Sequence, residues 1–382
     1  MFARTVTRQN HGADALTGPA AAVRQQNVLF VSSNGIGLGH LSRQLAVARR
    51  LAAGQTAVFH TLSYAAGEVS RSGYLYFGTQ HHRATGMEQE IWNKALGEDY
   101  CGLIEALRPK AFVHDATVVF GGTVEALLRN PDMASIWIRR PMWRAAHERF
   151  LQHSGLFKMI IEPGELAGQL DDGPTSSRRG EALCVPPVLH TDPSERLSRQ
   201  EARRVLGLPE TGMIICLQLP EHTDPHIQAI RADILDRLLA KPDVIVVELK
   251  SPLTAGNGMP VDPRVRALHL YPAFRYSLAW DAAVAAAGYN SFHENVLGAV
   301  PTLFVPNEGD EMDRQELRAQ WADWQGCGIM LRRQDAKNLD GPVERLLDTN
   351  ERDRIASRCH TIGWTNGAAA IARQVDELAP VR

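Results

Sequence analysis

Residues 282–294 read AAVAAAGYNSFHE, and this stretch decides the fold. Its first four residues are small and apolar, as expected for a short strand buried on both faces of a sheet. Gly288 and polar residues follow the strand, and a helix is expected to continue to Leu297. A strand, a glycine-containing turn and a helix in this order form the repeating unit of a doubly wound α/β domain.

The turn in this stretch has the residues of a phosphate-binding site. At the start of a helix, free backbone N–H groups and the positive end of the helix dipole attract an anion. Gly288 lets the backbone approach closely, and Asn290 and Ser291 can donate side-chain hydrogen bonds. Glu294 lies one turn further on, where a carboxylate can accept two hydroxyl protons from a ribose. The alternative is that Asn290 and Ser291 only cap the helix, since both residue types are favoured caps.

Strands and helices alternate through the rest of the chain. The first unit is the strand Asn27–Ser33, followed by a glycine-rich turn and a helix with apolar residues at spacings of three and four. The other expected strands are Thr56–His60, Ala111–His114, Ser135–Ile138, Lys158–Ile161, Met213–Gln218, Val244–Leu249, Ala267–Leu270 and Thr302–Val305. The expected helices include Met87–Leu107, Gly122–Arg129, Trp143–Gln152, Ser198–Leu206, Gly341–Asp348 and, closing the chain, Glu351–Leu378.

Polar and proline-rich sequence separates two sets of these units. The chain has 382 residues, which suggests two domains. Residues 171–180 read DDGPTSSRRG, and several prolines follow, as in linkers. We therefore expect a loosely ordered extension, two Rossmann-like doubly wound domains and a linker, with a ligand in the cleft between the domains. The expected boundaries are 1–25 for the extension, 26–180 for the first domain, 181–197 for the linker and 198–382 for the second domain with its closing helices.

Composition excludes several classes of protein. The formal net charge of -2 gives no sign of a nucleic-acid partner. The five cysteines are scattered and form no CxxC pair, which favours reduced thiols in a cytoplasmic protein. No apolar run approaches the roughly 18–20 residues that cross a bilayer, and we expect no signal peptide. The basic and aromatic segment 138–150 leaves open contact with an anionic acceptor or a membrane surface, although a solvated helix face is the simpler interpretation.

A second glycine-rich turn, NGIGLGH at residues 34–40, opens the first helix. In a dinucleotide-binding fingerprint the third glycine would fall near His40, and an acidic residue would stand about 20 positions later, near His60. An oxidoreductase of that type is therefore disfavoured. A neutral imidazole at this place can take a proton from a hydroxyl near neutral pH. The alternative is a histidine that caps the helix or packs against it.

The block 282–315 resembles the donor-binding signature of the family-1 and family-28 glycosyltransferases. Plant members of family 1 read approximately HCGWNSxxE, then GVP, then P, then D/E-Q. The matching spacings here run between Gly288, Glu294, Pro301 and Pro306. The DRQ that ends the block is closer to the peptidoglycan lipid I N-acetylglucosaminyltransferases.

This resemblance implies the two-domain GT-B fold and a nucleotide sugar as the donor substrate, with UDP favoured and dTDP possible. It implies no essential metal and no other cofactor, so the acidic run 308–313 is interpreted as a loop and not as a metal site. The implied donor contacts are Gly288, Asn290 and Ser291 with the diphosphate, Glu294 with the ribose, and Asp313 and Gln315 with hydroxyls of the sugar.

The sequence departs from the family pattern in three places. Ala286 replaces the phosphate-binding histidine, and the loop between Pro306 and Gln315 is longer than in either relative. The segment 217–224, LQLPEHTD, lacks the glycine-rich turn that often follows the first strand of the second domain.

The GxGH turn resembles the amino-terminal loop of the same glycosyltransferases, where the histidine faces the cleft. The resemblance implies that His40 is the catalytic base and that Gly37 and Gly39 leave room for the sugar and the diphosphate. Asp115 follows a strand at the ligand-binding end of the sheet and is expected to orient His40. His114 is an equal competitor for that role.

Together the two motifs predict an inverting glycosyltransferase that moves a sugar from a nucleotide sugar to an acceptor hydroxyl. The acceptor is expected to be a small molecule or a lipid-linked molecule. Two alternatives share the fold. One is a sugar-nucleotide 2-epimerase, which would need several clustered acids and a histidine. The other is a catalytically silent protein that activates a partner enzyme, which the alanine at position 286 keeps open.

Overall fold

The computed structural model of the chain describes residues 26–33, 38–220, 224–250, 262–309, 312–332, 334 and 337–378. These residues form two compact units. The first unit contains the described residues up to 164, together with 173–190 and those from 366 onward. The second unit contains 165–172 and 191–365. The chain therefore passes from one unit to the other and back more than once.

The first unit is built on a parallel sheet of seven strands, counted over the described residues, in the order β3-β2-β1-β4-β5-β6-β7. The strands are β1 (Gln26–Ser32), β2 (Gln55–Thr61), β3 (Leu75–Gly78), β4 (Ala111–Asp115), β5 (Ala134–Ile138), β6 (Met159–Pro163) and β7 (Leu183–Val185). The helices are α1 (Gly39–Ala48), α2 (Gly67–Arg71), α3 (His82–Thr85), α4 (Gln89–Leu107), α5 (Gly121–Arg129) and α12 (Gly367–Leu378), with 3-10 segments η1 (Ala145–Leu156) and η3 (Ser176–Glu181).

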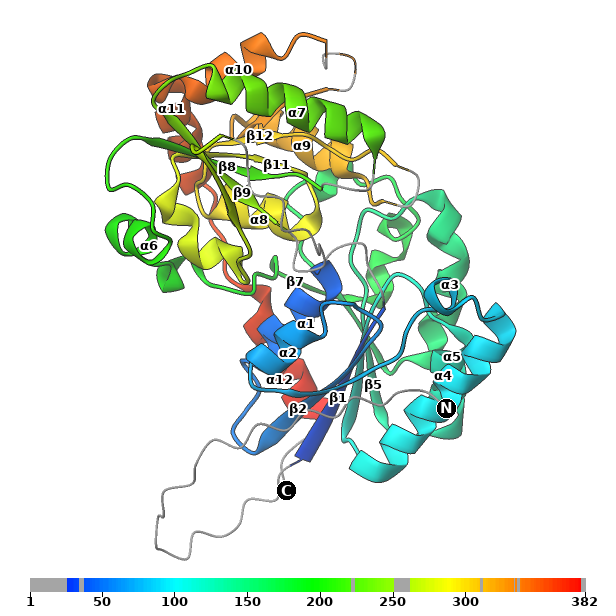
Figure 1. Cartoon of the computed structure of the whole chain (residues 1–382). Helices are drawn as coiled ribbons and strands as arrows, with labels where there is room; N and C mark the ends of the chain where they lie inside the picture. Colours follow the sequence, from blue (N-terminus) through cyan, green and yellow to red (C-terminus); the bar gives the residue numbers. More distant parts are fainter. Residues whose placement is uncertain are drawn as a thin grey trace, which may run out of the picture. The chain divides into compact units, whose positions relative to one another are not determined.

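Helices cover both faces of this sheet, which explains why its central strands β1 and β4 are almost entirely buried. Within the first unit, α4 and α5 lie on one face and α1 and α12 lie on the other (Figure 1). Trp92 and Tyr100 of α4 pack with Phe112 of β4 and Trp137 of β5 in one buried cluster. The core beneath α4 and α5 therefore depends on large aromatic side chains.

The second unit repeats this plan with a parallel sheet that has six described strands, in the order β10-β9-β8-β11-β12-β13. The strands are β8 (Met213–Gln218), β9 (Val244–Leu249), β10 (Val265–Leu268), β11 (Ala282–Ala285), β12 (Thr302–Phe304) and β13 (Ile329–Met330). The helices are α6 (Arg199–Val205), α7 (Pro225–Leu239), α8 (Tyr289–Leu297), α9 (Gln315–Gln325), α10 (Asp340–Leu347) and α11 (Thr349–His360), with 3-10 segments η2 (Gly168–Leu170), η4 (Pro193–Glu195) and η5 (Ala273–Ala279).

Each sheet has one topological switch point, which is the place where the order of successive strands along the sheet reverses direction. In the first unit this place lies between β1 and β4, and in the second unit it lies between β8 and β11. Connections leave the neighbouring strand ends in opposite directions there, and doubly wound sheets commonly bind ligands at the carboxyl edge beside such a point. The glycine-containing sequences follow β1 and β11, and residues 34–37 of the first lie outside the described part of the chain.

The observed boundaries differ from the expected ones in several places. The segment 181–197 was expected to be a linker, yet it contains β7, which pairs with β6 in the first sheet. The closing helices were expected in the second domain, but α12 belongs to the first unit because it packs against α1 and β7. Residues 143–152 were expected to form an α-helix, and the 3-10 segment η1 stands there with only Leu151 and Ser154 buried. The extension 1–25 lies outside the described residues.

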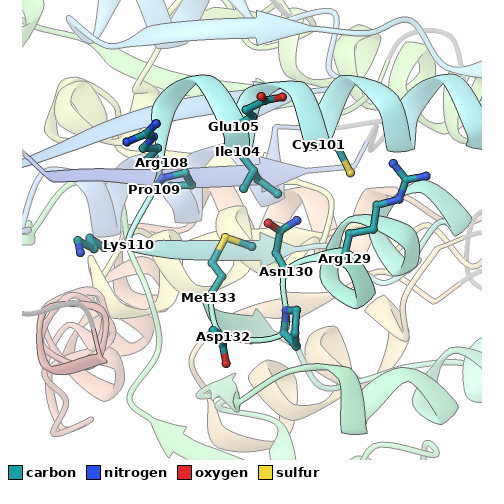
Figure 2. Close-up of a pocket in the computed structure, with 11 residues that line it drawn as sticks. Cys101, Ile104, Glu105, Arg108, Pro109, Lys110, Arg129, Asn130, Asp132 and Met133 are labelled. Atoms are coloured by element: carbon teal, nitrogen blue, oxygen red, sulfur yellow. The ribbon is translucent and has the colours of Figure 1, made fainter.

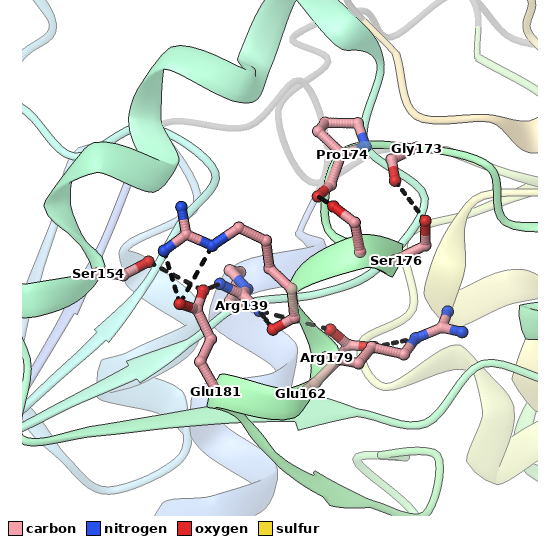
Figure 3. A network of polar contacts seen from close by, with 10 residues as sticks. Arg139, Ser154, Glu162, Gly173, Pro174, Ser176, Arg179 and Glu181 are labelled. Atoms are coloured by element: carbon pink, nitrogen blue, oxygen red, sulfur yellow. Dashed lines mark hydrogen bonds and ion pairs between the residues drawn. The ribbon is translucent and has the colours of Figure 1, made fainter.

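A buried arginine holds together the segments that follow β5 and β6 (Figure 3). Arg139 comes directly after β5 and is fully buried, and it forms an ion pair with Glu181 and donates 3.1 Å to the carbonyl of Arg178. Ser154 donates to the same Glu181 carboxylate at 3.1 Å, and Arg179 pairs with Glu162 at 2.9 Å. These contacts fix η1 and η3 on the edge of the first sheet.

The docking of α12 gives a test of the unit boundary. A Cβ atom on Gly367 would lie 2.0 Å from the carbonyl oxygen of Pro186, in a segment that belongs to the same unit. We expect Gly367→Ala to lower the free energy of unfolding by about 1–3 kcal/mol, because backbone must move to make room. Urea unfolding measures this. Gly363→Ala is the matched control, since nothing lies within 4 Å of its Cβ position. Equal stability of the two variants would contradict the docking described here.

Candidate functional site

The first unit places His40 and Asp115 in direct contact. His40 is the second residue of α1, and Asp115 is the last residue of β4. Because Ser32 of β1 lies in register with Asp115, the chain that leaves β1 begins beside the carboxyl end of β4. The Nδ1 atom of His40 lies 2.7 Å from Oδ1 of Asp115, and the Asp115 side chain is fully buried.

Arg43 completes this contact and was not among the predicted site residues. It lies three positions after His40 on α1, so both side chains occupy the same face of the helix. Its Nε donates 3.0 Å to Oδ2 of Asp115, and its Nη2 donates 2.6 Å to Oδ1. Both oxygens of the buried carboxylate are thus engaged, in the two-pronged geometry that arginine favours.

The electrostatics of the trio leave the imidazole neutral. Burial alone would raise the pKa of Asp115, but the charge of Arg43 and the hydrogen bond with His40 outweigh it and hold that pKa below its ordinary value. Burial lowers the pKa of His40 from 6.5, against the opposing effect of Asp115. The Nη2 atom of Arg43 also lies 3.0 Å from Nδ1 of His40, but the contact with Asp115 is shorter, at 2.7 Å, and an ionised carboxylate can only accept, so we assign the Nδ1 proton to the bond with Asp115. The lone pair then resides on Nε2, as a general base requires.

The competing residue, His114, points into the core. Side chains alternate along a strand, so His114 and Asp115 occupy opposite faces of the first sheet. The His114 ring stacks on Phe157 at 5.7 Å, and burial lowers the pKa of His114 to about 4.

Two glycines were predicted to leave room for the sugar and the diphosphate beside His40. Gly39 has open space around its Cβ position, and Gly37 lies outside the described residues.

The second unit forms the turn expected after β11. Gly288 is the N-cap of α8 with an extended backbone, and the N–H groups of the first helical turn have no acceptor within the helix. Ser291 donates its hydroxyl proton to the carbonyl of Ala286 at 2.7 Å, so this side chain closes the turn. The Oδ1 atom of Asn290 is buried and has no hydrogen-bond partner among the described residues. Backbone N–H groups, more than the serine hydroxyl, are therefore the donors this turn offers.

Glu294 lies one turn into α8, as expected, but it differs from an ordinary carboxylate. Its side chain is partly buried, and within the described chain no hydrogen bond or ion pair engages it. Burial raises its pKa to about 8. Glu294 therefore keeps its proton at neutral pH, and it can both donate and accept a hydrogen bond.

Gln315 is the first residue of α9, and Asp313 lies two positions before it. The side-chain oxygen of Gln315 accepts from the backbone N–H of Asn307 at 3.0 Å, and its Nε2 lies 4.0 Å from where a Cβ on Gly288 would stand. The carboxylate of Asp313 is bound to Arg318 at 2.6 Å, and Asp313 is only 7% exposed. Gln315 therefore borders the turn directly, whereas Asp313 is mainly engaged with an arginine.

Two other kinds of site are a metal centre and a cavity. Over the described parts of the chain, no group of three or more His, Cys, Asp or Glu side chains could hold a metal ion. A cavity of about 630 Å³ in the first unit lies beside Pro109 and Lys110, which precede β4, and Met133, which precedes β5 (Figure 2). These residues stand at the amino ends of the strands, and His40 and Asp115 stand at the carboxyl ends. The cavity is therefore separate from the predicted site.

The raised pKa of Glu294 makes a prediction for stability. The folded protein keeps a proton on Glu294 up to about pH 8, whereas the unfolded chain releases it near pH 4.5. Stability from this group is present below pH 4.5 and is lost as the pH rises through 8. We expect Glu294→Gln to lose less thermal stability than the wild type between pH 5 and about pH 9. Glu344→Gln, at an exposed site on α10, controls for the replacement of one glutamate by glutamine. If the melting temperature of Glu294→Gln falls with pH as steeply as that of the wild type, the pKa of Glu294 is not raised as described.

Comparisons with solved protein structures identify the fold of the chain. No family model and no curated protein matches the sequence. Among solved structures, the glycosyltransferase SnogD from Streptomyces nogalater matches with a TM-score of 0.62 at 13% identity, over 93% of this chain and 100% of that one. MurG from Acinetobacter baumannii matches with 0.60 at 11% identity, over 92% and 99%. The spinosyn rhamnosyltransferase SpnG, complexed with thymidine diphosphate, matches with 0.61 at 15% identity, over 91% and 100%.

No described helix is long and apolar enough to cross a membrane.

At identities of 11–15%, the structural matches establish the fold. The two parallel sheets and the structural matches agree with the expectation drawn from the sequence signature. The chain has the two-domain fold of the GT-B glycosyltransferases, with two Rossmann-like domains.

Proposed function

We propose that this protein transfers a sugar from a nucleoside diphosphate sugar to a hydroxyl group of a small-molecule acceptor, with inversion at the anomeric carbon. The observation that carries the proposal is the His40–Asp115–Arg43 contact at the switch point of the first sheet. The turn at Gly288 occupies the corresponding switch point of the second sheet. Ligands of doubly wound proteins bind at such points.

His40 acts as the general base in this proposal. Its Nε2 takes the proton from the acceptor hydroxyl, and the oxygen attacks the anomeric carbon as the bond to the diphosphate breaks. Asp115 fixes the tautomer and stabilises the imidazolium that forms, as the aspartate of a Ser-His-Asp triad does. Arg43 keeps Asp115 ionised and in place, because it engages both carboxylate oxygens.

The amino end of α8 stabilises the leaving group. Negative charge develops on the diphosphate as the glycosidic bond breaks, and backbone N–H groups fixed in advance stabilise such charge at little reorganisation cost. Gly288 leaves space for the phosphate to approach, and Glu294 binds the ribose. Gln315 is the best-placed side chain for a sugar hydroxyl, because it borders the turn.

The complexes of one structural neighbour support the substrate class. SpnG was solved with thymidine diphosphate and also with the spinosyn aglycone. We therefore propose a nucleoside diphosphate sugar, with UDP or dTDP as the nucleotide, and a small acceptor. A thermal-shift screen of UDP, dTDP and their sugars tests this, since a ligand of the folded state raises the melting temperature with its concentration. The absence of any shift would contradict the proposal. An isomerised donor would instead indicate an epimerase, and binding without turnover in the presence of acceptors would indicate a silent protein.

The base assignment predicts a specific loss. We expect His40→Ala to lower kcat by about 100-fold or more, since general bases contribute factors of 10²–10⁴. Affinity for the nucleoside diphosphate should stay unchanged, because that site is assigned to the second unit. Steady-state kinetics and calorimetry measure the two quantities. Full turnover by His40→Ala would exclude the assignment.

The lowered pKa of His40 predicts the pH profile. The imidazole must be neutral to take a proton, so activity falls as the pH drops through its pKa. Burial places that pKa below 6.5, so the acid limb of kcat/KM should have its midpoint below pH 6.5. A midpoint above pH 6.5 would show that the imidazole is not held as described.

Gly288 gives a steric test of the diphosphate site. A Cβ at this position would meet only Ser291 Oγ at 3.7 Å and Gln315 Nε2 at 4.0 Å, which are ordinary contacts. Gly288→Ala should therefore fold, with a stability loss of less than about 1 kcal/mol. We expect its affinity for the nucleoside diphosphate to fall about tenfold or more, because the methyl group takes the space of the phosphate. Unchanged affinity would place the diphosphate elsewhere.

A further inference from the structure

A buried network of charges lies behind the turn of the second unit. Its centre is Arg318 on α9, which is fully buried. The Nε atom donates 2.8 Å to Glu165, and Nη1 donates 2.6 Å to Asp313. The same Nη1 lies 3.2 Å from the carbonyl oxygen of Ala287, and the guanidinium lies 5.7 Å from the ring centre of Tyr289. One arginine thus contacts the residues on both sides of Gly288.

A second buried side chain holds the other side of the turn. His293 of α8 is fully buried, and its Nδ1 donates 2.7 Å to the carbonyl oxygen of Tyr289. Its Nε2 accepts from the backbone N–H of Leu166 at 3.2 Å and lies 3.3 Å from Glu165. The two carbonyl groups that flank Gly288 are therefore each bound by a buried side chain, and both side chains contact Glu165.

Glu165 is the common anchor. It belongs to the short segment 165–172, which is far from α9 in sequence but lies in the second unit. Burial alone would raise its pKa, but Arg318 and His293 outweigh that effect and lower the pKa to about 2. The pKa of Arg318 is raised by its two carboxylates in spite of burial. Glu165 and Arg318 therefore stay charged, and the ion pair between them persists across the physiological pH range.

We propose that Arg318, anchored by Glu165, is a positioning residue of the donor site, which fixes the backbone carbonyl of Ala287 next to Gly288 and the carboxylate of Asp313. This inference rests on the proposed function, because it takes the turn as the diphosphate site. Stabilisation of a leaving group requires donors that are already in place. The Ala287–Tyr289 backbone receives that rigidity from side chains of α8, α9 and the segment 165–172.

The test compares arginines that are equally buried. Arg203 is also fully buried in the second unit, where it bonds the carbonyl of Ala279 at 2.8 Å and pairs with Asp281 at 3.1 Å. Arg203→Met controls for the loss of a buried arginine away from the turn. Affinities for UDP and dTDP are measured by calorimetry on Arg318→Met, Arg203→Met and Glu165→Gln, with urea unfolding of each. Arg318→Lys is included because a lysine keeps the charge but lacks the planar fork of donors with which the guanidinium reaches Glu165, Asp313 and Ala287 together.

We expect the wild type to bind a nucleoside diphosphate, and Arg318→Met and Arg318→Lys to bind it about tenfold or more weakly. Glu165→Gln should show the same direction of change, and Arg203→Met should keep the wild-type affinity at a similar loss of stability. The inference is overturned if folded Arg318→Met binds as tightly as the wild type. If Arg318→Met does not fold, wild-type affinity in Glu165→Gln and Arg318→Lys overturns it. If the wild type itself binds no nucleoside diphosphate, the proposed function fails instead.

Discussion

Parallel pairing of every described strand is the constraint on which the rest of the structure depends. In a parallel sheet all carboxyl ends lie on one edge, so residues far apart in sequence meet there. This places Asp115, at the end of β4, beside His40, which follows β1. The same rule in the second sheet places the Gly288 turn at its switch point. The chemistry proposed for this protein follows from these two edges.

Both candidate sites also depend on buried arginines that are matched to carboxylates. Isolated buried charges are costly, and a buried pair is strongly destabilised when one partner is removed. Arg43 engages both oxygens of Asp115, and Arg318 binds Glu165 and Asp313. Glu294 is the exception, because no hydrogen bond or ion pair within the described residues compensates its burial and its pKa rises to about 8. A polar group that is left unsatisfied in this way fits a residue that meets its partner only when a ligand binds.

Local patterns in the sequence predicted more of the fold than of the contacts within the sites. The strands β8, β9 and β11 have the predicted bounds because short apolar runs bounded by turns are local signals. The Gly288 turn was predicted for the same reason. Arg318 and Glu165 are 153 positions apart, and no local pattern links them. The position of α12 was also missed, because Gly367 meets Pro186 through tertiary packing. Arg43 offered a weak signal, since it stands one helical turn from His40.

The stereochemistry of transfer tests the central claim most directly. The protein is incubated with the nucleotide sugar that stabilises it most and with a panel of hydroxylated small molecules, and the anomeric proton of the product is followed by NMR. A single displacement, with His40 as base and the α8 turn holding the diphosphate, predicts a glycoside of inverted configuration and one nucleoside diphosphate released per transfer. A product with retained configuration, or a donor that is epimerised without release of nucleoside diphosphate, would contradict the account.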